Sequence, residues 1–217
     1  MFKTIQMSRI KSDPTQITKV KNPTDDFLEK AVSLNYQVIW YIDNPSDALV
    51  IQAVKKNIVA LRDLPPQSYT VNYCAIQLDP RSLKYMTDPD ESIQHLAISK
   101  NGLLVGLIPD PSPDIQLLAV NNVASAISRI KNPTVVAQIA AIQYDYKLVN
   151  SITNPHVDAI SEALIIYKND KYKKSSFTLK DLALSSEQWW QLVQIFPEYH
   201  RMMNLTEEQR NYAILCS

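Results

Sequence analysis

The stretch NPSDALVIQAVKKN, residues 44–57, contains the pattern that decides the fold. It opens with an Asn-Pro pair, places Leu49, Ala53 and Val54 at i, i+4, i+5 spacing, and closes with an asparagine. This spacing puts the three apolar side chains on one face of a helix. The opening recurs along the chain, as Asn-Pro at 22–23, 132–133 and 154–155 and as Asp-Pro at 88–89 and 110–111. The chain therefore restarts one helical element several times.

A period of 22 residues relates these restarts. Stepping by this period from Ala31 meets alanine every time, at Ala53, Ala75, Ala97, Ala119, Ala141 and Ala163. The next column is aliphatic throughout: Val32, Val54, Ile76, Ile98, Val120, Ile142 and Leu164. Two more apolar columns run from Ile39 to Val149 and from Ile42 to Ile152. Such columns indicate a repeat protein in which each unit stacks on its neighbours.

Each repeat is predicted to contain two short helices. The Asn or Asp before proline is expected to be the N-cap of the first helix, with proline in its first turn. Acidic pairs such as Asp25-Asp26 and Asp90-Glu91 then suit the positive end of the helix dipole. A second, shorter helix is expected after another column of capping residues: Asn35, Asn57, Asp79, Asn101 and Asp145. Because neither helix would be stable alone, the pattern predicts an all-α solenoid of about seven to nine two-helix repeats.

The period divides the chain into four segments. Residues 1–20 are expected to form a degenerate N-terminal capping repeat, because Asp13-Pro14 matches Asp79-Pro80 in its spacing. Residues 21–166 hold the regular repeats. The register breaks after Ala163, which predicts an insertion loop at 167–181 and irregular C-terminal capping repeats at 182–217. Lysines gather at 168–174 in the loop and could contact phosphates, but a solvated insertion is the favoured interpretation.

Composition argues against several classes of protein. The chain has 22 basic and 22 acidic residues, a balance that gives no field for nucleic acid, so no nucleic-acid partner is expected. It has only two glycines, whereas phosphate-binding loops need several. Two cysteines give no disulfide framework and favour a reducing, cytoplasmic setting. We find no apolar run of membrane-spanning length and expect no signal peptide.

Two segments, AVKKNIVAL at 53–61 and AISKNGLLV at 97–105, resemble a short repeat family of unknown function. The core of that family reads Ala-Val-Lys-x-Asn-Gly-x-Ala-Leu, and its members occur in bacterial, phage and giant-virus proteins. The resemblance covers about residues 18–165. It implies a HEAT-like stack of helix pairs and a phage or bacterial origin. It implies no reaction, because the family brings no catalytic residues.

No catalytic, cofactor or metal site is predicted. The three histidines, His95, His156 and His200, lack metal-ligand spacing and are expected to be structural. The acidic pairs could act as general acid and base, but the helix dipole explains them better. Cys74 directly precedes an alanine of the repeat column and is expected to be a small core hydrophobe.

A candidate binding surface lies on the second helices, just after the Ile39 column. Equivalent positions of adjacent repeats should lie about 10 Å apart, the usual distance between packed helices. Aromatic and basic side chains gather at these positions and would form one stripe of typical binding anchors. The alternative is ordinary solvent-exposed surface. The predicted surface comprises Trp40, Tyr41, Arg62, Lys84, Tyr85 and Arg129.

The segment SSEQWWQLVQIF, residues 185–196, is predicted to form a helix near the C-terminus. Trp189 shares one helical face with Leu192, Val193 and Phe196, whereas the neighbouring Trp190 points about 100° away. We expect Trp189 to cover the end of the repeat core. Trp190 is a candidate contact to a second copy of the chain, which would make a homodimer.

Together these features predict a cytoplasmic, non-enzymatic repeat scaffold that binds a macromolecule. The expected partner is a protein, and the resemblance suggests a phage or bacterial protein that binds and modulates a host protein. One alternative is a structural or assembly subunit of a virion or homo-oligomer. An enzyme with a groove site is the least favoured alternative, because no motif combines a nucleophile with a general base. No cofactor and no membrane association are expected.

Overall fold

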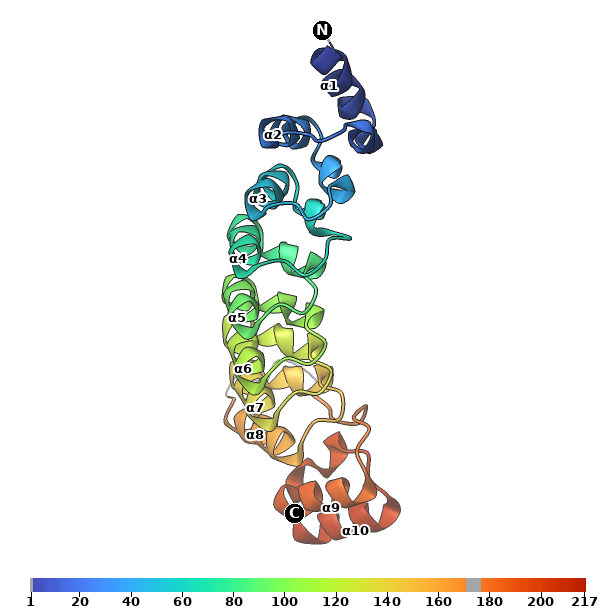
Figure 1. Cartoon of the computed structure of the whole chain (residues 1–217). Coiled ribbons are helices and arrows are strands. Elements are labelled where there is room, and N and C mark those ends of the chain that lie inside the picture. The colour runs from blue at the N-terminus through green and yellow to red at the C-terminus, as the bar shows by residue number, and fades with distance from the viewer. Residues whose placement is uncertain (1, 171–176) are drawn as a thin grey trace. The chain divides into compact units, whose positions relative to one another are not determined.

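The computed structural model describes residues 2–170 and 177–217, with side chains from residue 6 onward. The secondary structure of these residues is helical, without a β-strand (Figure 1). The chain is therefore all-α and repeat-like, as the period predicts. It divides into two compact units, Met1–Lys100 and Asn101–Ser217, which we call unit 1 and unit 2 and describe separately.

Unit 1 alternates α-helices of ten or eleven residues with 3-10 helices of four or six. Each α-helix contacts the next one, from α1 to α5. Within the unit, α2 to α5 follow one side and the 3-10 helices the other (Figure 1). The bounds are α1 Phe2–Ser12, η1 Pro14–Lys19, α2 Asp25–Leu34, η2 Tyr36–Tyr41, α3 Asp47–Lys56, η3 Ile58–Leu61, α4 Tyr69–Leu78, η4 Pro80–Tyr85 and α5 Glu91–Lys100.

Unit 2 continues the alternation and then departs from it. Its helices α6, α7 and α8 contact one another in sequence, and α8, α9 and α10 follow in the same way. The bounds are η5 Gly102–Leu107, α6 Pro113–Asn122, η6 Ala124–Arg129, α7 Val135–Tyr144, η7 Tyr146–Ser151, α8 Val157–Asn169, α9 Ser186–Ile195, η8 Pro197–Met202 and α10 Glu207–Cys216.

The core of both units is built from the columns found in the sequence. All seven alanines of the Ala31 column are 0% exposed, which places them where neighbouring helices approach most closely. The Val32 column is at most 3% exposed and the Ile39 column at most 4%. Ile10 and Ile17 extend these two columns one period toward the N-terminus and are also buried. The alanine, Val32 and Ile39 columns are therefore confirmed as the core, whereas the Ile42 column is only half-buried at Ile42, Leu64 and Met86.

The predicted role of Asn-Pro is wrong. The true N-caps lie two residues later, where Thr24, Ser46, Ser68, Ser112 and Thr134 accept a hydrogen bond from the backbone N–H three residues on. The asparagine instead has a left-handed backbone in several repeats, with φ of 47° at Asn22, 48° at Asn44 and 53° at Asn154. Asn and Asp tolerate that conformation better than other non-glycine residues. Asn-Pro is therefore a turn that precedes the helix.

The second column of caps is confirmed, but the helices that it starts are 3-10 helices. Asn35, Asn57, Asp79, Asn101 and Asp145 each accept a hydrogen bond from the backbone N–H two residues on. Asp13 caps η1 in the same way. Short i→i+3 helices are what a segment of four to six residues can close.

The predicted insertion loop begins later than expected. Helix α8 continues to Asn169, so residues 167–169 of the predicted loop are helical. Residues 171–176, which carry most of the lysine cluster, lie outside the described part of the chain. Beyond them Phe177, Leu179 and Leu182 are buried, and the Leu179 N–H donates to the Met202 carbonyl at 2.8 Å. The described end of the predicted loop, residues 177–181, is therefore packed: Phe177 lies against Tyr146 and Tyr167, and Leu179 bonds to η8.

Candidate functional site

Trp40 is the most tightly held residue of the predicted binding stripe. Its indole Nε1–H donates to the Ala60 carbonyl at 3.0 Å, and the ring of Tyr36 packs edge-on against it at 6.1 Å. The guanidinium of Arg62, one repeat further, lies 5.0 Å from the centre of the indole ring. This is a cation–π arrangement. The structure thus brings Trp40 and Arg62 into one cluster across two repeats.

Lys84 and Tyr85 form a second pair on η4, with the ammonium 5.7 Å from the ring centre. Helix η4 contacts η3, which ends at Leu61 beside Arg62. The start of η4 is fixed by Asp79, whose carboxylate caps the helix and also accepts from the Arg81 guanidinium. The hydrogen bond from Arg81 holds the pKa of Asp79 below its ordinary 3.8. Asp79 therefore both caps η4 and pairs with Arg81.

A groove of about 560 Å³ lies beside Trp40 in unit 1. The ends of η1 and η2 line it, together with the start of α2. Tyr41, exposed over 41% of its surface, is at its edge. The lining residues are Ile17, Thr18, Val20, Pro23, Leu28, Trp40, Tyr41, Ile42 and Asp43. The lining exposes polar and apolar surface in nearly equal amounts, as the contact surfaces of proteins do.

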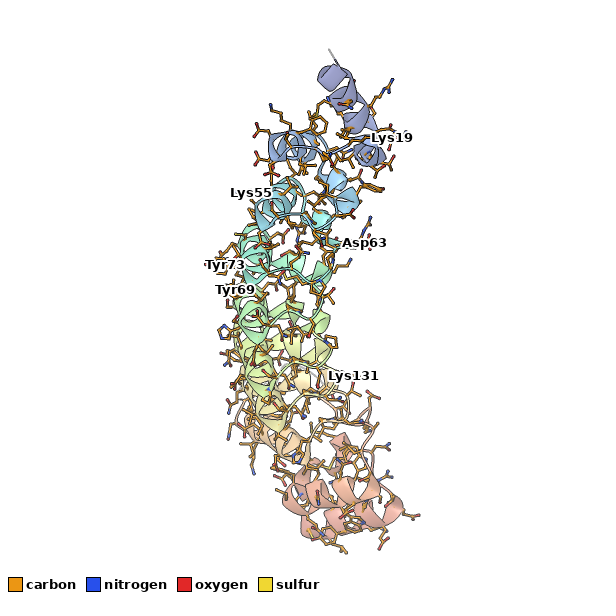
Figure 2. All side chains as sticks on the ribbon, in the orientation of Figure 1. Lys19, Lys55, Asp63, Tyr69, Tyr73 and Lys131 are labelled. Atoms are coloured by element: carbon orange, nitrogen blue, oxygen red, sulfur yellow. The ribbon has the colours of Figure 1, made fainter. Side chains whose placement is uncertain are left out.

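A second hollow of about 460 Å³ shares Val20 and Pro23 with this groove. Lys19 and Lys21 line it, so the turn from η1 to α2 carries positive charge next to both hollows. Lys19 lies on the 3-10 side of unit 1, as does Asp63, whereas Lys55, Tyr69 and Tyr73 lie on the α-helical side (Figure 2). Stripe and hollows thus belong to the 3-10 side of the unit.

The remaining predicted site residues lie in unit 2. Arg129 is exposed at the end of η6, and its side chain starts close to Gly106. Trp190 is half-buried and packs edge-on against Tyr212 of α10, with the ring centres 5.4 Å apart. Trp189 is 4% exposed, so the two tryptophans face different surroundings. Trp190 therefore already has an aromatic neighbour within its own chain.

The residues weighed for catalysis or metal binding are scattered. His95 is exposed on α5, His156 caps α8 by accepting from the Asp158 N–H at 3.3 Å, and His200 bonds the Pro197 carbonyl. In residues 2–170 and 177–217 no three His, Cys, Asp or Glu side chains group as metal ligands would. Cys74 is only partly buried, so it is less enclosed than expected.

An exposed aromatic pair on α4 was not predicted. Tyr69 and Tyr73 stack with ring centres 6.0 Å apart and are 53% and 41% exposed. They lie one turn apart on the outer face of the helix, where no column of the repeat requires an aromatic residue. Spacing at i, i+4 is the signal that could have found them.

A buried glutamine column was missed as well. Gln116 and Gln138 are 5% and 4% exposed, and each donates from Nε2 to the carbonyl of the proline five residues earlier. The Oε1 of each accepts the N-cap N–H of the next α-helix, Thr134 and His156 respectively, at 2.8 Å. We call this pair of hydrogen bonds the glutamine bridge. It ties the turn before one helix to the start of the next.

Among the described residues, no helix combines the length and the apolar character needed to cross a bilayer. Comparison with known proteins found no matching family model, no matching curated protein and no matching solved structure.

Proposed function

We propose that the protein is a non-enzymatic repeat scaffold that binds a protein partner through the 3-10 side of unit 1. The observation that carries this proposal is the Trp40–Arg62 cluster beside a groove of mixed polar and apolar lining. Tryptophan, tyrosine and arginine are the residues that most often dominate binding energy at protein interfaces. The scaffold would act in the cytoplasm, as a phage or bacterial protein that modulates a host protein.

Preorganisation supports this assignment. The indole of Trp40 is fixed by its hydrogen bond to Ala60 and by the edge of Tyr36, so little side-chain freedom remains to be lost on binding. Arg62 donates through Nε to Asp63 at 3.0 Å, in an exposed ion pair that is worth little by itself. Its other guanidinium N–H groups can serve a partner.

Site-specific photo-crosslinking tests the proposal. Tyr41 on the groove and Tyr73 on the α-helical side are both 41% exposed and make a matched pair. Each would be replaced by a photoreactive phenylalanine and irradiated in lysate of the native host. We expect one protein to crosslink from position 41 and not from position 73. Crosslinking from position 73 alone would move the interface to the α-helical side.

The purified partner then allows a direct measurement. The triple variant Trp40→Ala, Arg62→Ala, Lys84→Glu should bind it at least about tenfold more weakly in calorimetry, because it removes the central anchors. Circular dichroism should show unchanged helix content. Full affinity of a folded triple variant would exclude the stripe as the interface.

A structural or assembly subunit is the second candidate. The observation that favours it is the apolar surface of α10, where Ile214 and Leu215 are 57% and 86% exposed next to the Trp190–Tyr212 pair. If this surface joins two copies, light scattering should report a dimer, and Trp190→Ala should lower the mass without unfolding the chain. A monomeric wild-type protein at high concentration would rule the homodimer out. An enzyme with a groove site remains the least favoured candidate.

A further inference from the structure

One position of the α-helix in each repeat faces the neighbouring repeat. In the described part of the chain, two kinds of side chain at this position leave no buried polar group without a hydrogen bond. The position is apolar at Leu28, Val50 and Ile160, or it carries glutamine at Gln94, Gln116 and Gln138. An apolar side chain leaves no polar group of its own to satisfy. The glutamine bridge uses both ends of its amide, at 2.8–3.0 Å. Both solutions avoid a buried polar atom without a partner.

Asn72 on α4 occupies the same position and achieves neither solution. It is 7% exposed, and its Nδ2 donates to the Gln67 carbonyl at a long 3.4 Å. Its Oδ1 is buried without a hydrogen-bond partner among the described residues. Asparagine is one methylene shorter than glutamine, so its amide cannot span the same gap. The N-cap that corresponds to Thr134 and His156 is Asp90, at the start of α5.

Ser82, in the same repeat, gives an independent sign of the same weakness. Its hydroxyl is fully buried and has no hydrogen-bond partner among the described residues. The equivalent residues of the other repeats are apolar, as at Val38, Ala60 and Leu104. Both buried side-chain polar atoms found without a partner therefore belong to residues 66–87. A partly satisfied polar contact in a low-dielectric interior is less stable than an apolar one.

We propose that the α4–α5 joint is a built-in weak joint of unit 1, at which α5 separates from α4 before the rest of the unit unfolds. Local opening with its own free energy is a general property of folded chains and follows the density of satisfied contacts. Because η4 contacts α5, this opening would also remove a packing partner from η4, which carries the Lys84–Tyr85 pair. The proposal does not depend on the function proposed above.

Hydrogen–deuterium exchange of the full-length protein tests this joint. In the variant Asn72→Gln the longer amide can reach the Asp90 N–H, and α5 amides such as that of Gln94 should exchange about fivefold more slowly, the effect of about one hydrogen bond. The reverse change in unit 2, Gln138→Asn, should speed exchange of α8 amides such as that of Ile160 by a similar factor. Amides of α2 serve as the internal reference in both variants.

A second variant guards against misfolding of the first. Asn72→Leu copies the apolar solution found at Leu28 and should also slow exchange in α5. Slower exchange in either folded variant supports the weak joint. Unchanged or faster α5 exchange in both variants, with melting temperatures at or above that of the wild type, would overturn it.

Discussion

Unit 1 and unit 2 share one repeat, but they differ in how completely its apolar positions are buried and its buried polar groups are hydrogen-bonded. The position three residues after the Ile39 column is half-buried in unit 1, at Val20, Ile42, Leu64 and Met86. Its counterparts in unit 2 are buried, with Ile108, Ile130 and Ile152 at most 9% exposed. In unit 2, Gln116 and Gln138 form complete glutamine bridges. In unit 1, Gln94 donates to the Pro89 carbonyl at 2.8 Å, whereas the Oδ1 of Asn72 has no hydrogen-bond partner among the described residues.

This difference separates the positions that define the repeat from the positions that can vary near a functional site. The alanine column and the two aliphatic columns are equally buried in both units, so they define the repeat. Two other positions differ between the units. The position of Ile42 is less buried in unit 1, and the position of Asn72 leaves a buried polar atom there without a partner in the described part of the chain. The groove beside Trp40 lies in unit 1 and is lined by two residues of the half-buried row, Val20 and Ile42. The candidate site thus lies where the apolar position after the Ile39 column is only half-buried.

The largest expected effect tests what the units share. Ala97 in unit 1 and Ala119 in unit 2 are 0% exposed at equivalent helix contacts. Changing either to leucine should overpack the contact and cost about 3 kcal/mol, the upper end for such changes. Urea unfolding followed by circular dichroism measures this, and exposed Lys100→Ala should be nearly silent. A leucine variant as stable as the wild type would mean that its unit does not stack through this column.

The second test concerns the closer packing of unit 2. A Cβ atom on Gly102 would lie 2.5 Å from the Ala119 carbonyl oxygen, a backbone atom that cannot move alone. Gly102→Ala should therefore cost about 2 kcal/mol. The matched control is the exposed Gly106→Ala, whose nearest neighbour is the Arg129 side chain at 3.2 Å, and it should cost less. Unit 1 places Ile58 and Pro80 at the position of Gly102. Equal losses from the two glycine variants would contradict the closer approach in unit 2.

The third test isolates the glutamine bridge. Gln138→Met keeps the length of the side chain but leaves the Pro133 carbonyl and the His156 N–H without their partner. We expect a loss of about 1–2 kcal/mol, the usual effect of breaking buried hydrogen bonds. Gln143→Met, on the exposed face of the same helix, is the control. If both variants unfold at the same urea concentration as the wild type, the bridge adds nothing to unit 2.

The sequence predicts the repeated core because apolar burial leaves a periodic record. Seven alanines at one spacing can be read without coordinates, and so can the capping column from Asn35 to Asp145. The N-caps could have been found in the same way, since Thr24, Ser46, Ser68, Asp90, Ser112 and Thr134 also stand one period apart. The more familiar meaning of Asn-Pro, a cap followed by a first-turn proline, led to the wrong helix start.

The candidate site is less predictable because it depends on departures from the period. Trp40 could be named as an anchor from its type and column, but its bonds to Ala60 and Arg62 join different repeats. The groove lies between the ends of η1 and η2, so it depends on the packing of two helices and not on any single residue. The glutamine bridge was missed because glutamine fills its column only at Gln94, Gln116 and Gln138, after three repeats that carry other residues there.

The smallest expected effect compares a charged cap with a neutral one. Asp79 and Asn57 cap successive 3-10 helices of unit 1, but only Asp79 also accepts a hydrogen bond from an arginine, Arg81. That bond lowers the pKa of Asp79 below 3.8 in the folded chain, so its stabilisation is present above this pH and is lost as the pH falls through the lower, folded pKa. Asp79→Asn keeps the cap acceptor and should lower the melting temperature slightly near neutral pH, because an exposed ion pair contributes little. Arg81→Gln should reproduce the loss, and the double variant should add nothing further. The difference from the wild type should vanish in acid below the folded pKa. A difference that is the same at both pH values would show that the charge of Asp79 does not contribute to the stability of unit 1.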